Sequence, residues 1–335
     1  MSESDISRRE FLKVASLAGL AVATGSLWSQ RVYSATESSG GSSFSVVHFT
    51  DIHVQPELNA ERGFAQAIQA MNSHGADFAL SGGDLVFDVL AANPDRCRRL
   101  WNMYVRRTKD FNMPVHQVAG NHDYFGLGNK KITPAEAGYG KAAMLEALVL
   151  ENTYRSFDHK GWRFIVLDSV NPNPDGGWRP LLDDQQKEWL KEQLQGSGLP
   201  KVVTLHVPVV TLRGQLTEST NPNAAGVVMN DGKEIRELFE ANNVKLVLQG
   251  HVHFCEHLQF KGVHYITSGA VSGSWWKGPH MGFPEGYGLV TFQKDSFTWE
   301  YKTFGWEAKV ASLYTAEERD LIARMYRERE IFALV

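Results

Sequence analysis

The chain has 335 residues, 43% of them apolar, so it can bury one large core, although this length does not exclude a second small domain. Its 34 basic and 38 acidic residues give a net charge of -4, which excludes an overall positive field for nucleic acid or an anionic membrane. A phosphate-bearing ligand would therefore have to be bound by charge concentrated locally at its site. Cys97 and Cys255 are too few for a disulfide framework, so we expect two buried thiols, with a single bridge left open.

The first 34 residues have the features of an export signal. Arg8 and Arg9 precede Phe-Leu-Lys, then an uncharged stretch at 14–30, and then small residues suited to cleavage. This resembles a twin-arginine signal. The stretch of roughly 17 residues is marginal for a membrane span, so we expect removal and no stable span in the mature form. We predict a signal peptide at 1–34 read by the twin-arginine translocation machinery, a flexible linker at 35–43, and a periplasmic or secreted product.

From residue 44 onward, short apolar runs alternate with helical patterns, which indicates α/β organisation. The runs predict strands at 44–49, 77–80, 115–119, 164–167, 202–205, 244–248 and 264–267. Helices are predicted around 64–71, from the capping box at Thr133, at 184–194, from about Lys233, and at 315–330.

Five of these strands end in polar side chains that can ligate metals. The residues are Asp51, His53, Asp84, Asn121, His122, Asp123, His206, His251 and His253. Open α/β sheets bind ligands at the carboxyl ends of their strands, so we expect these groups to meet at one edge of one sheet. A lone histidine there would be read as a core residue. Charged groups at five strand ends would repel one another unless cations neutralised them.

Taken in order, these blocks resemble the motifs of the calcineurin-like metallophosphoesterases. The blocks are Asp51-Ile52-His53, Gly83-Asp84, Gly120-Asn121-His122-Asp123, His206 and Gly250-His251-Val252-His253. The resemblance implies an α/β (α+β) fold, a four-layer β-sandwich of mixed sheets flanked by helices, over residues 44–335 with a C-terminal helix.

The same resemblance implies two metal ions and a hydrolytic mechanism. One ion would be bound by Asp51, His53 and His253 and the other by Asn121, His206 and His251, with Asp84 bridging the pair. These ligand types suit Fe, Mn or Zn. Two such ions would activate a bridging hydroxide for in-line attack on the phosphoryl group. His122 is expected to assist by stabilising the transition state or protonating the leaving oxygen, with Asp123 orienting its ring.

Departures from known subfamilies narrow the function. No arginine follows Asp84, which disfavours protein Ser/Thr phosphatases, and Phe87 stands where purple acid phosphatases have tyrosine. The remaining resemblance is to bacterial phosphodiesterases and phosphatases, including the cyclic-nucleotide type. We predict hydrolysis of small-molecule phosphate esters, with diesters slightly preferred and a phosphomonoesterase as the alternative. A non-catalytic metal-binding scaffold fits less well, because such a protein would be expected to have lost His122 or a histidine ligand and this chain has kept them. A zinc amide hydrolase fits less well, because it needs three ligands and this chain has seven candidates.

Three loops rich in Gly and Pro are long enough to shape a site. They lie at 171–180, between His206 and Lys233, and at 273–280. Their candidates for substrate contact are Arg179, Arg213, Trp275, Trp276 and Lys277. The paired tryptophans could stack on a ring of the substrate or pack against the sandwich, and a solvated surface role stays open for each basic residue.

Overall fold

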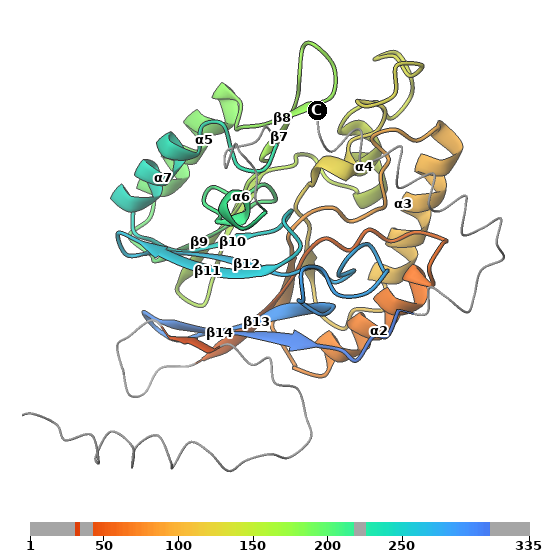
Figure 1. The fold of residues 1–335 in the computed structure, drawn as a ribbon. Helices are drawn as coiled ribbons and strands as arrows, with labels where there is room; N and C mark the ends of the chain where they lie inside the picture. The colour runs from red at the N-terminus through yellow and green to blue at the C-terminus, as the bar shows by residue number, and fades with distance from the viewer. Residues whose placement is uncertain (1–30, 34–42, 218–225, 309–335) are drawn as a thin grey trace, which may run out of the picture.

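Two six-stranded sheets lie face to face, with helices on both outer sides (Figure 1). The computed structural model describes residues 31–33, 43–217 and 226–308. Almost all of the predicted signal and linker, and the whole predicted C-terminal helix at 315–330, lie outside these residues. The four-layer arrangement of mixed sheets predicted from the motif resemblance is confirmed.

The first sheet combines parallel and antiparallel strands. Its order is β1 (Arg31–Tyr33), β14 (Phe297–Thr303), β13 (Gly286–Phe292), β2 (Phe44–Phe49), β3 (Phe78–Ser81) and β4 (Val115–His116). The strands β2, β3 and β4 run parallel, whereas β13 pairs antiparallel with β2 and with β14. The carboxyl ends of the parallel strands therefore open on the same side.

The second sheet has the same mixed character. Its order is β11 (Cys255–Phe260), β12 (Val263–Ser268), β10 (Val244–Gln249), β9 (Lys201–Thr204), β6 (Trp162–Val166) and β5 (Arg155–His159). Four adjacent strands of this sheet, β12, β10, β9 and β6, run parallel to one another. A small hairpin of β7 (Val170–Pro172) and β8 (Trp178–Pro180) follows β6.

The helices cover the outer faces of the two sheets. Their bounds are α2 (Ala60–Asn72), α3 (Pro94–Thr108), η1 (Asn121–Asp123), α4 (Ala142–Leu148), α5 (Asp184–Gln195), α6 (Arg213–Leu216) and α7 (Gly232–Ala241). The predicted face of α2 is confirmed, since Phe64, Ala67, Ile68 and Met71 are all buried. Helix α3 was not predicted, although Asn93 caps it and proline occupies its first turn.

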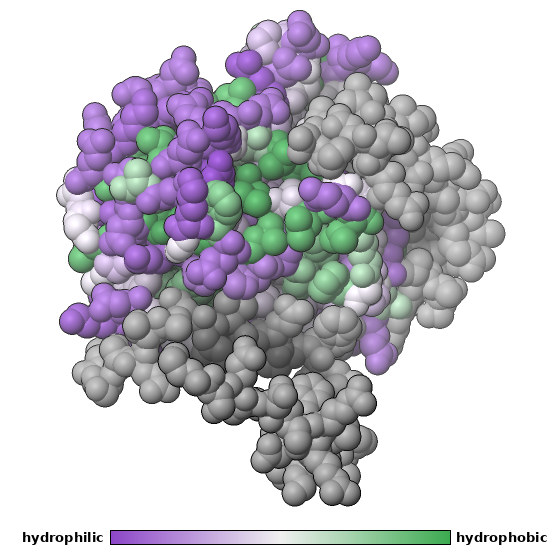
Figure 2. Space-filling view, turned by 60° about the vertical axis from the view of Figure 1, so that its left-hand side comes forward, coloured by the Kyte–Doolittle hydropathy of each residue, from purple (hydrophilic) through white to green (hydrophobic). Residues whose placement is uncertain are grey.

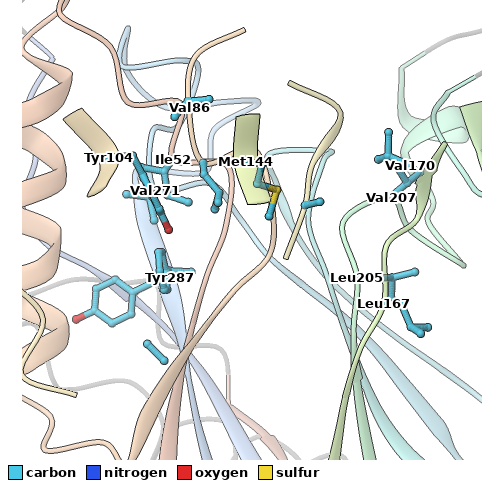
Figure 3. Close-up of a cluster of buried hydrophobic side chains, with 14 of the residues drawn as sticks. Ile52, Val86, Tyr104, Met144, Leu167, Val170, Leu205, Val207, Val271 and Tyr287 are labelled. Atoms are coloured by element: carbon cyan, nitrogen blue, oxygen red, sulfur yellow. The ribbon is translucent and has the colours of Figure 1, made fainter. Parts of the chain in front are cut away.

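Alternation along the central strands places apolar side chains on both faces of each sheet. In β2, Val46 belongs to the apolar cluster between the sheets, whereas Val47 faces the cluster under the helices. Leu246 and Val247 of β10 divide in the same way. Figure 3 shows part of the cluster under the helices and loops, where Leu167 and Leu205 lie side by side just beyond β6 and β9. Buried on both faces, such strands read as continuous apolar runs.

The strands that lead to the candidate ligands belong to two sheets, so the expectation that these ligands meet at one edge of one sheet was wrong. Strands β2, β3 and β4 lie in the first sheet, and β9 and β10 lie in the second. The ends of these strands nevertheless meet on one side of the sandwich, since Nε2 of His206 after β9 is 3.2 Å from Oδ2 of Asp84 after β3, and Nε2 of His253 after β10 is 3.3 Å from Oδ1 of Asp51 after β2. Periodicity reports which face of a strand is buried, but it carries no information about which strands pair.

The predicted helix at Thr133 is absent from the structure. Thr133 and Glu136 form only a turn, in which the N–H of Glu136 donates to the carbonyl of Thr133 at 2.9 Å. Gly138 and Gly140 follow with φ of 82° and 65°, a left-handed geometry that ends any helical turn, and α4 begins at Ala142.

The structure also decides two smaller points. Strand β4 spans Val115–His116 and is shorter than the predicted run, because the N–H of Val118 donates to the side-chain hydroxyl of Ser81 in β3 and not to a backbone carbonyl of that strand. Cys97 and Cys255 are both free and buried, as expected, so the bridge left open by the sequence does not form.

Five large hydrophobic residues are exposed among the described residues: Val149, Leu212, Leu216, Phe260 and Met281. Figure 2 shows one face on which hydrophobic surface is gathered in the middle and bordered by hydrophilic residues. Among the described helices, none combines the length and apolar character needed to cross a membrane.

Gly63 in α2 should not accept a methyl group. An added Cβ would lie 2.2 Å from Cζ3 of Trp276, whose side chain is fully buried. Alanine favours a helix interior by up to about 1 kcal/mol, whereas overpacking costs about 1–3 kcal/mol. We therefore expect Gly63→Ala to lower the free energy of unfolding, measured by urea denaturation.

Gly198→Ala is the matched control for this substitution. A Cβ there meets nothing within 4 Å, and the residue is exposed. We expect its stability to stay within about 0.5 kcal/mol of the parent. If Gly63→Ala proved as stable as Gly198→Ala, the tight contact with Trp276 would be refuted.

Candidate metal centre

Seven polar side chains from the two sheets meet where the strands end. Strand β2 leads to Asp51 and His53, β3 to Asp84, β4 to Asn121, β9 to His206, and β10 to His251 and His253. Six of these residues are at most 4% exposed, and His251 is half-buried. The facing sheets thus bring together groups separated by up to 202 positions in the sequence.

The first group consists of Asp51, His53 and His253, whose ligand atoms all lie within 4.8 Å of one another. Nε2 of His253 is 3.3 Å from Oδ1 of Asp51 and 3.1 Å from Nε2 of His53. One carboxylate oxygen and two ring nitrogens therefore converge on one small volume.

The second group consists of Asp84, His206 and His251, also within 4.8 Å. Oδ2 of Asp84 is 3.2 Å from Nε2 of His206 and 3.5 Å from Nε2 of His53, so this carboxylate reaches both groups. Oδ1 of Asn121 lies 3.1 Å from Nε2 of His206 and adds an amide oxygen to the second group.

Backbone carbonyls orient three of the rings. Nδ1 of His206 is 2.7 Å from the carbonyl of Gly82, and Nδ1 of His253 is 2.6 Å from the carbonyl of Gly273. Nε2 of His251 is 2.7 Å from the carbonyl of Gly226. A neutral ring that donates its N–H to such a carbonyl presents the other nitrogen as a lone pair, which is how metal-binding histidines are usually held.

The backbone at the ligands is strained. The left-handed φ values of Asp51, His53, Asp84, His251 and His253 are 54°, 45°, 52°, 73° and 61°. Residues other than glycine adopt this region at a cost of about 1–3 kcal/mol, and such strain gathers at functional sites.

The motif glycines allow the loops to approach closely. A Cβ at Gly120 would lie 2.1 Å from the backbone nitrogen of Asp84, and one at Gly250 would lie 2.2 Å from the hydroxyl oxygen of Thr50. A residue with a side chain at either position would push neighbouring ligand loops apart.

Comparison with known proteins identifies the family to which the chain belongs. The family described as "Calcineurin-like phosphoesterase" matches residues 44–255, and "C terminal of Calcineurin-like phosphoesterase" matches residues 265–335. The chain belongs to the calcineurin-like phosphoesterase family. It is accordingly a phosphoric ester hydrolase of a family that depends on dinuclear metal centres.

Similar proteins carry several activities in their names. A Synechococcus protein named "Probable cyclic nucleotide phosphodiesterase" is 29% identical over 218 residues, which cover 62% of this chain and 73% of that protein. The bovine "Serine/threonine-protein phosphatase CPPED1" is 26% identical over 222 residues, 65% of this chain and 66% of the relative. A dimetal phosphatase from Danio rerio shares the fold, with a TM-score of 0.58, 13% identity, and coverage of 78% of this chain and 96% of that one.

In this phosphoesterase, burial and neighbouring charges shift the pKa values of Asp84 and His206 in opposite directions. Burial favours a higher pKa for Asp84, but His206 and His122 hold that pKa well below its ordinary value. Burial favours a lower pKa for His206, but Asp84 and Asp51 raise it to about 9. Burial and the charge of His206 lower the pKa of His251 to about 3. The chain by itself thus balances its ionised carboxylates with a protonated imidazole, a role that a bound cation can take over.

His122 stands beside the two groups, but Asp123 does not orient its ring. Nε2 of His122 lies 3.9 Å from Oδ2 of Asp84, and Nδ1 lies 3.3 Å from Oδ1 of Asp88. The Asp123 carboxylate instead accepts hydrogen bonds from the backbone N–H groups of Leu85, Val86 and Gly120 at 2.8–3.1 Å. Asp123 therefore joins two ligand loops, and Asp88 is the ring partner that the sequence reading missed.

The predicted substrate residues separate into different environments. Trp276 is fully buried, and its Nε1 donates to the carbonyl of Ile52 at 2.8 Å. Trp275 is half-buried, with its ring centroid 4.5 Å from that of His253. Arg179 is exposed on β8, while Arg213 and Lys277 are half-buried. Packing thus accounts for Trp276, whereas Trp275 borders the metal-ligand groups.

Trp178 lies beside the site, although the sequence indicated this residue only as part of the loop at 171–180. Its ring stands edge-on to that of His251, with centroids 5.8 Å apart and planes at 87°. The residue sits on β8, in the segment expected to be a loop, because this segment folds back as the β7–β8 hairpin.

A buried carboxylate supports the loop that carries His122. Asp168, fully buried just after β6, accepts hydrogen bonds from the hydroxyls of Tyr124 at 2.5 Å and Thr153 at 2.6 Å. Nζ of Lys141 is 2.6 Å from the same carboxylate oxygen. The strand end of β6 is thereby tied to the residues immediately after η1.

Removal of this carboxylate should be costly. Asp168→Ala would leave the buried hydroxyl of Tyr124 without its acceptor and Lys141 without its counterion, so we expect a loss of roughly 3 kcal/mol in the free energy of unfolding, measured by urea denaturation. Asp158→Ala is the control, because Asp158 also pairs with a cation, Arg163, but its side chain is 48% exposed. We expect a loss of about 1 kcal/mol or less there. Equal effects of the two substitutions would contradict the supporting role of Asp168.

Proposed function

We propose that the chain hydrolyses phosphate esters with two bound metal ions and prefers diesters to monoesters. The observation that carries this proposal is the position of Asp84, whose carboxylate lies within 3.5 Å of a ring from each ligand group. A carboxylate shared by two sets of imidazoles suits two cations held side by side.

The donor set fits such ions. Asp51, His53 and His253 would hold one, Asn121, His206 and His251 would hold the other, and Asp84 would contact both. Carboxylate, amide and imidazole donors suit Fe, Mn or Zn. When bound, paired ions supply Lewis acidity at the phosphoryl oxygens and lower the pKa of coordinated water.

His122 is the proposed proton donor. With Nδ1 directed to Asp88, its Nε2 is left on the side of Asp84 and thus of the ligand groups. From there it can hydrogen-bond to a phosphoryl oxygen or give a proton to the departing alkoxide. Asp88 would orient the ring and stabilise its protonated form.

Two observations support diesters as the preferred substrates. The Synechococcus relative is named for cyclic nucleotides, which are diesters. Both ligand groups are also bordered by indole rings, Trp178 and Trp275, which suit an organic substituent better than they suit the second negative charge of a monoester. The name of the bovine relative keeps a phosphomonoesterase as the second candidate.

Hydrolysis after metal reconstitution tests this function. Protein stripped with a chelator and reloaded with Mn, Fe or Zn should bind about two ions per chain and hydrolyse bis(4-nitrophenyl) phosphate with a higher kcat/KM than 4-nitrophenyl phosphate. Turnover of neither substrate with any of the metals would refute the proposal, and a faster monoester would replace it with the second candidate.

Asp84→Asn tests the shared ligand within the same assay. Metal content and kcat/KM should fall together, by more than the ~10–100-fold typical for residues that only hydrogen-bond to metal ligands. Asp95→Asn is the control, because its side chain is 91% exposed and pairs only with nearby Arg98. If the Asp84→Asn variant kept full turnover with one bound ion or none, the assignment of Asp84 as a ligand shared by both ions would be refuted.

We further propose export by the twin-arginine machinery to the periplasm or beyond. Support comes from the Arg8-Arg9 motif and the uncharged stretch that follows it. Changing Arg8 and Arg9 to lysine together should keep the protein in the cytoplasm, as measured by cell fractionation. The same change at Arg98 and Arg99, an adjacent pair in α3, should leave export intact. Unchanged export of the first variant would refute this route.

A further inference from the structure

The loop that follows β12 is built as a rigid support. Trp276 anchors it, with a fully buried indole that donates to the carbonyl of Ile52 at 2.8 Å and packs edge-to-face on Trp306, 5.6 Å away. The hydroxyl of Ser272 donates to the carbonyl of Asp51 at 2.7 Å, and the N–H of Ser274 donates to the carbonyl of Gly278 at 2.8 Å. Ser272 and Trp276 thus fix the loop to the segment that carries Asp51 and His53, and the Ser274–Gly278 bond closes the loop on itself.

This support presents Trp275 to the first ligand group. Its indole centroid is 4.5 Å from the ring of His253 and 5.9 Å from that of His53. His280 stands perpendicular to it at 6.0 Å. The residue is half-buried and not enclosed in the core as Trp276 is.

The backbone of Trp275 is strained in order to hold this position. Its φ is 51°, in the left-handed region that a bulky side chain rarely adopts, and Trp276 follows at 69°. The burial of Trp276 offsets this strain, because that ring cannot move without losing its contacts in the core. The two tryptophans therefore have separate roles, with Trp276 locking the turn and Trp275 facing the site.

We propose that Trp275 determines substrate specificity by stacking on a planar ring in the ester group that the enzyme does not cleave. The inference rests on the proposed phosphodiesterase function and names its substrate class, diesters with an aromatic or heteroaromatic substituent. A phosphoryl group held by both ligand groups would bring its substituents within a few Å of this indole. A flat ring can stack on the indole face through dispersion, and the uncharged indole does not compete with the metal ligands for the phosphate.

Trp178 is the alternative position for such a contact, and the geometry favours Trp275. Trp178 borders one ligand ring, that of His251, and does so edge-on. Trp275 borders two ligand rings at tilts of 39° and 51°. Trp275 therefore lies closer to a ligand ring, at 4.5 Å, than Trp178 does at 5.8 Å.

Two diesters with the same leaving group provide the test. The metal-loaded enzyme is assayed with phenyl 4-nitrophenyl phosphate and methyl 4-nitrophenyl phosphate, and the ratio of their kcat/KM values is the readout. We expect the parent to prefer the phenyl ester, Trp275→Ala to lower the ratio about tenfold, and Trp275→Phe to retain most of it. Trp189→Ala is the control, because this half-buried tryptophan packs on Tyr154 and not on a ligand ring.

The outcomes separate this inference from the function on which it rests. Turnover of both diesters without a phenyl preference in the parent would overturn the stacking role and leave the phosphodiesterase function standing. An unchanged ratio in Trp275→Ala, or a ratio lost in Trp178→Ala instead, would also overturn it. Equal losses on both substrates with a lower metal content would assign Trp275 a purely structural role. Absence of turnover on either diester by the parent would contradict the proposed function itself.

Discussion

Two buried carboxylates, Asp51 and Asp84, share a small volume with four imidazole rings, and the cost of burying their charge governs the rest of the site. Where water is excluded, like charges this close repel strongly unless positive charge lies between them. The protein alone meets this requirement in part, because its carboxylates raise the pKa of His206 to about 9. The carbonyls of Gly82, Gly226 and Gly273 matter for the same reason, since they determine which ring nitrogen faces the carboxylates.

The sandwich supplies the rigidity that this arrangement needs. Five ligand residues keep left-handed backbones, and an isolated loop would relax such strain. Here the loops extend from the ends of two packed sheets whose central strands are buried on both faces. Hydrogen bonds to the carboxylates of Asp123 and Asp168 connect one loop to the next. The low exposure of six ligands is a consequence of this packing and strengthens every electrostatic contact among them.

Groups at the border of the ligand cluster differ in chemistry from those at its centre. The centre is built of carboxylates, imidazoles and one amide, which suit cations and a phosphoryl group. Its border carries aromatic rings, Trp178 and Trp275, together with the His122–Asp88 pair. In the function we propose, the central residues carry the chemical step and the bordering loops carry the choice of substrate.

The sequence by itself predicted that the seven candidate ligands meet, because six of them lie within four residues of the end of a buried strand and that pattern is local. It also determined the buried face of α2, whose period of 3.6 residues is visible in the chain. Only the tertiary structure decided that the strands divide between two sheets, that Asp88 and not Asp123 faces His122, and that Trp276 is core while Trp275 borders the site. The physical reason is that strand pairing and loop conformation depend on contacts between residues far apart in the chain, and no local periodicity encodes them.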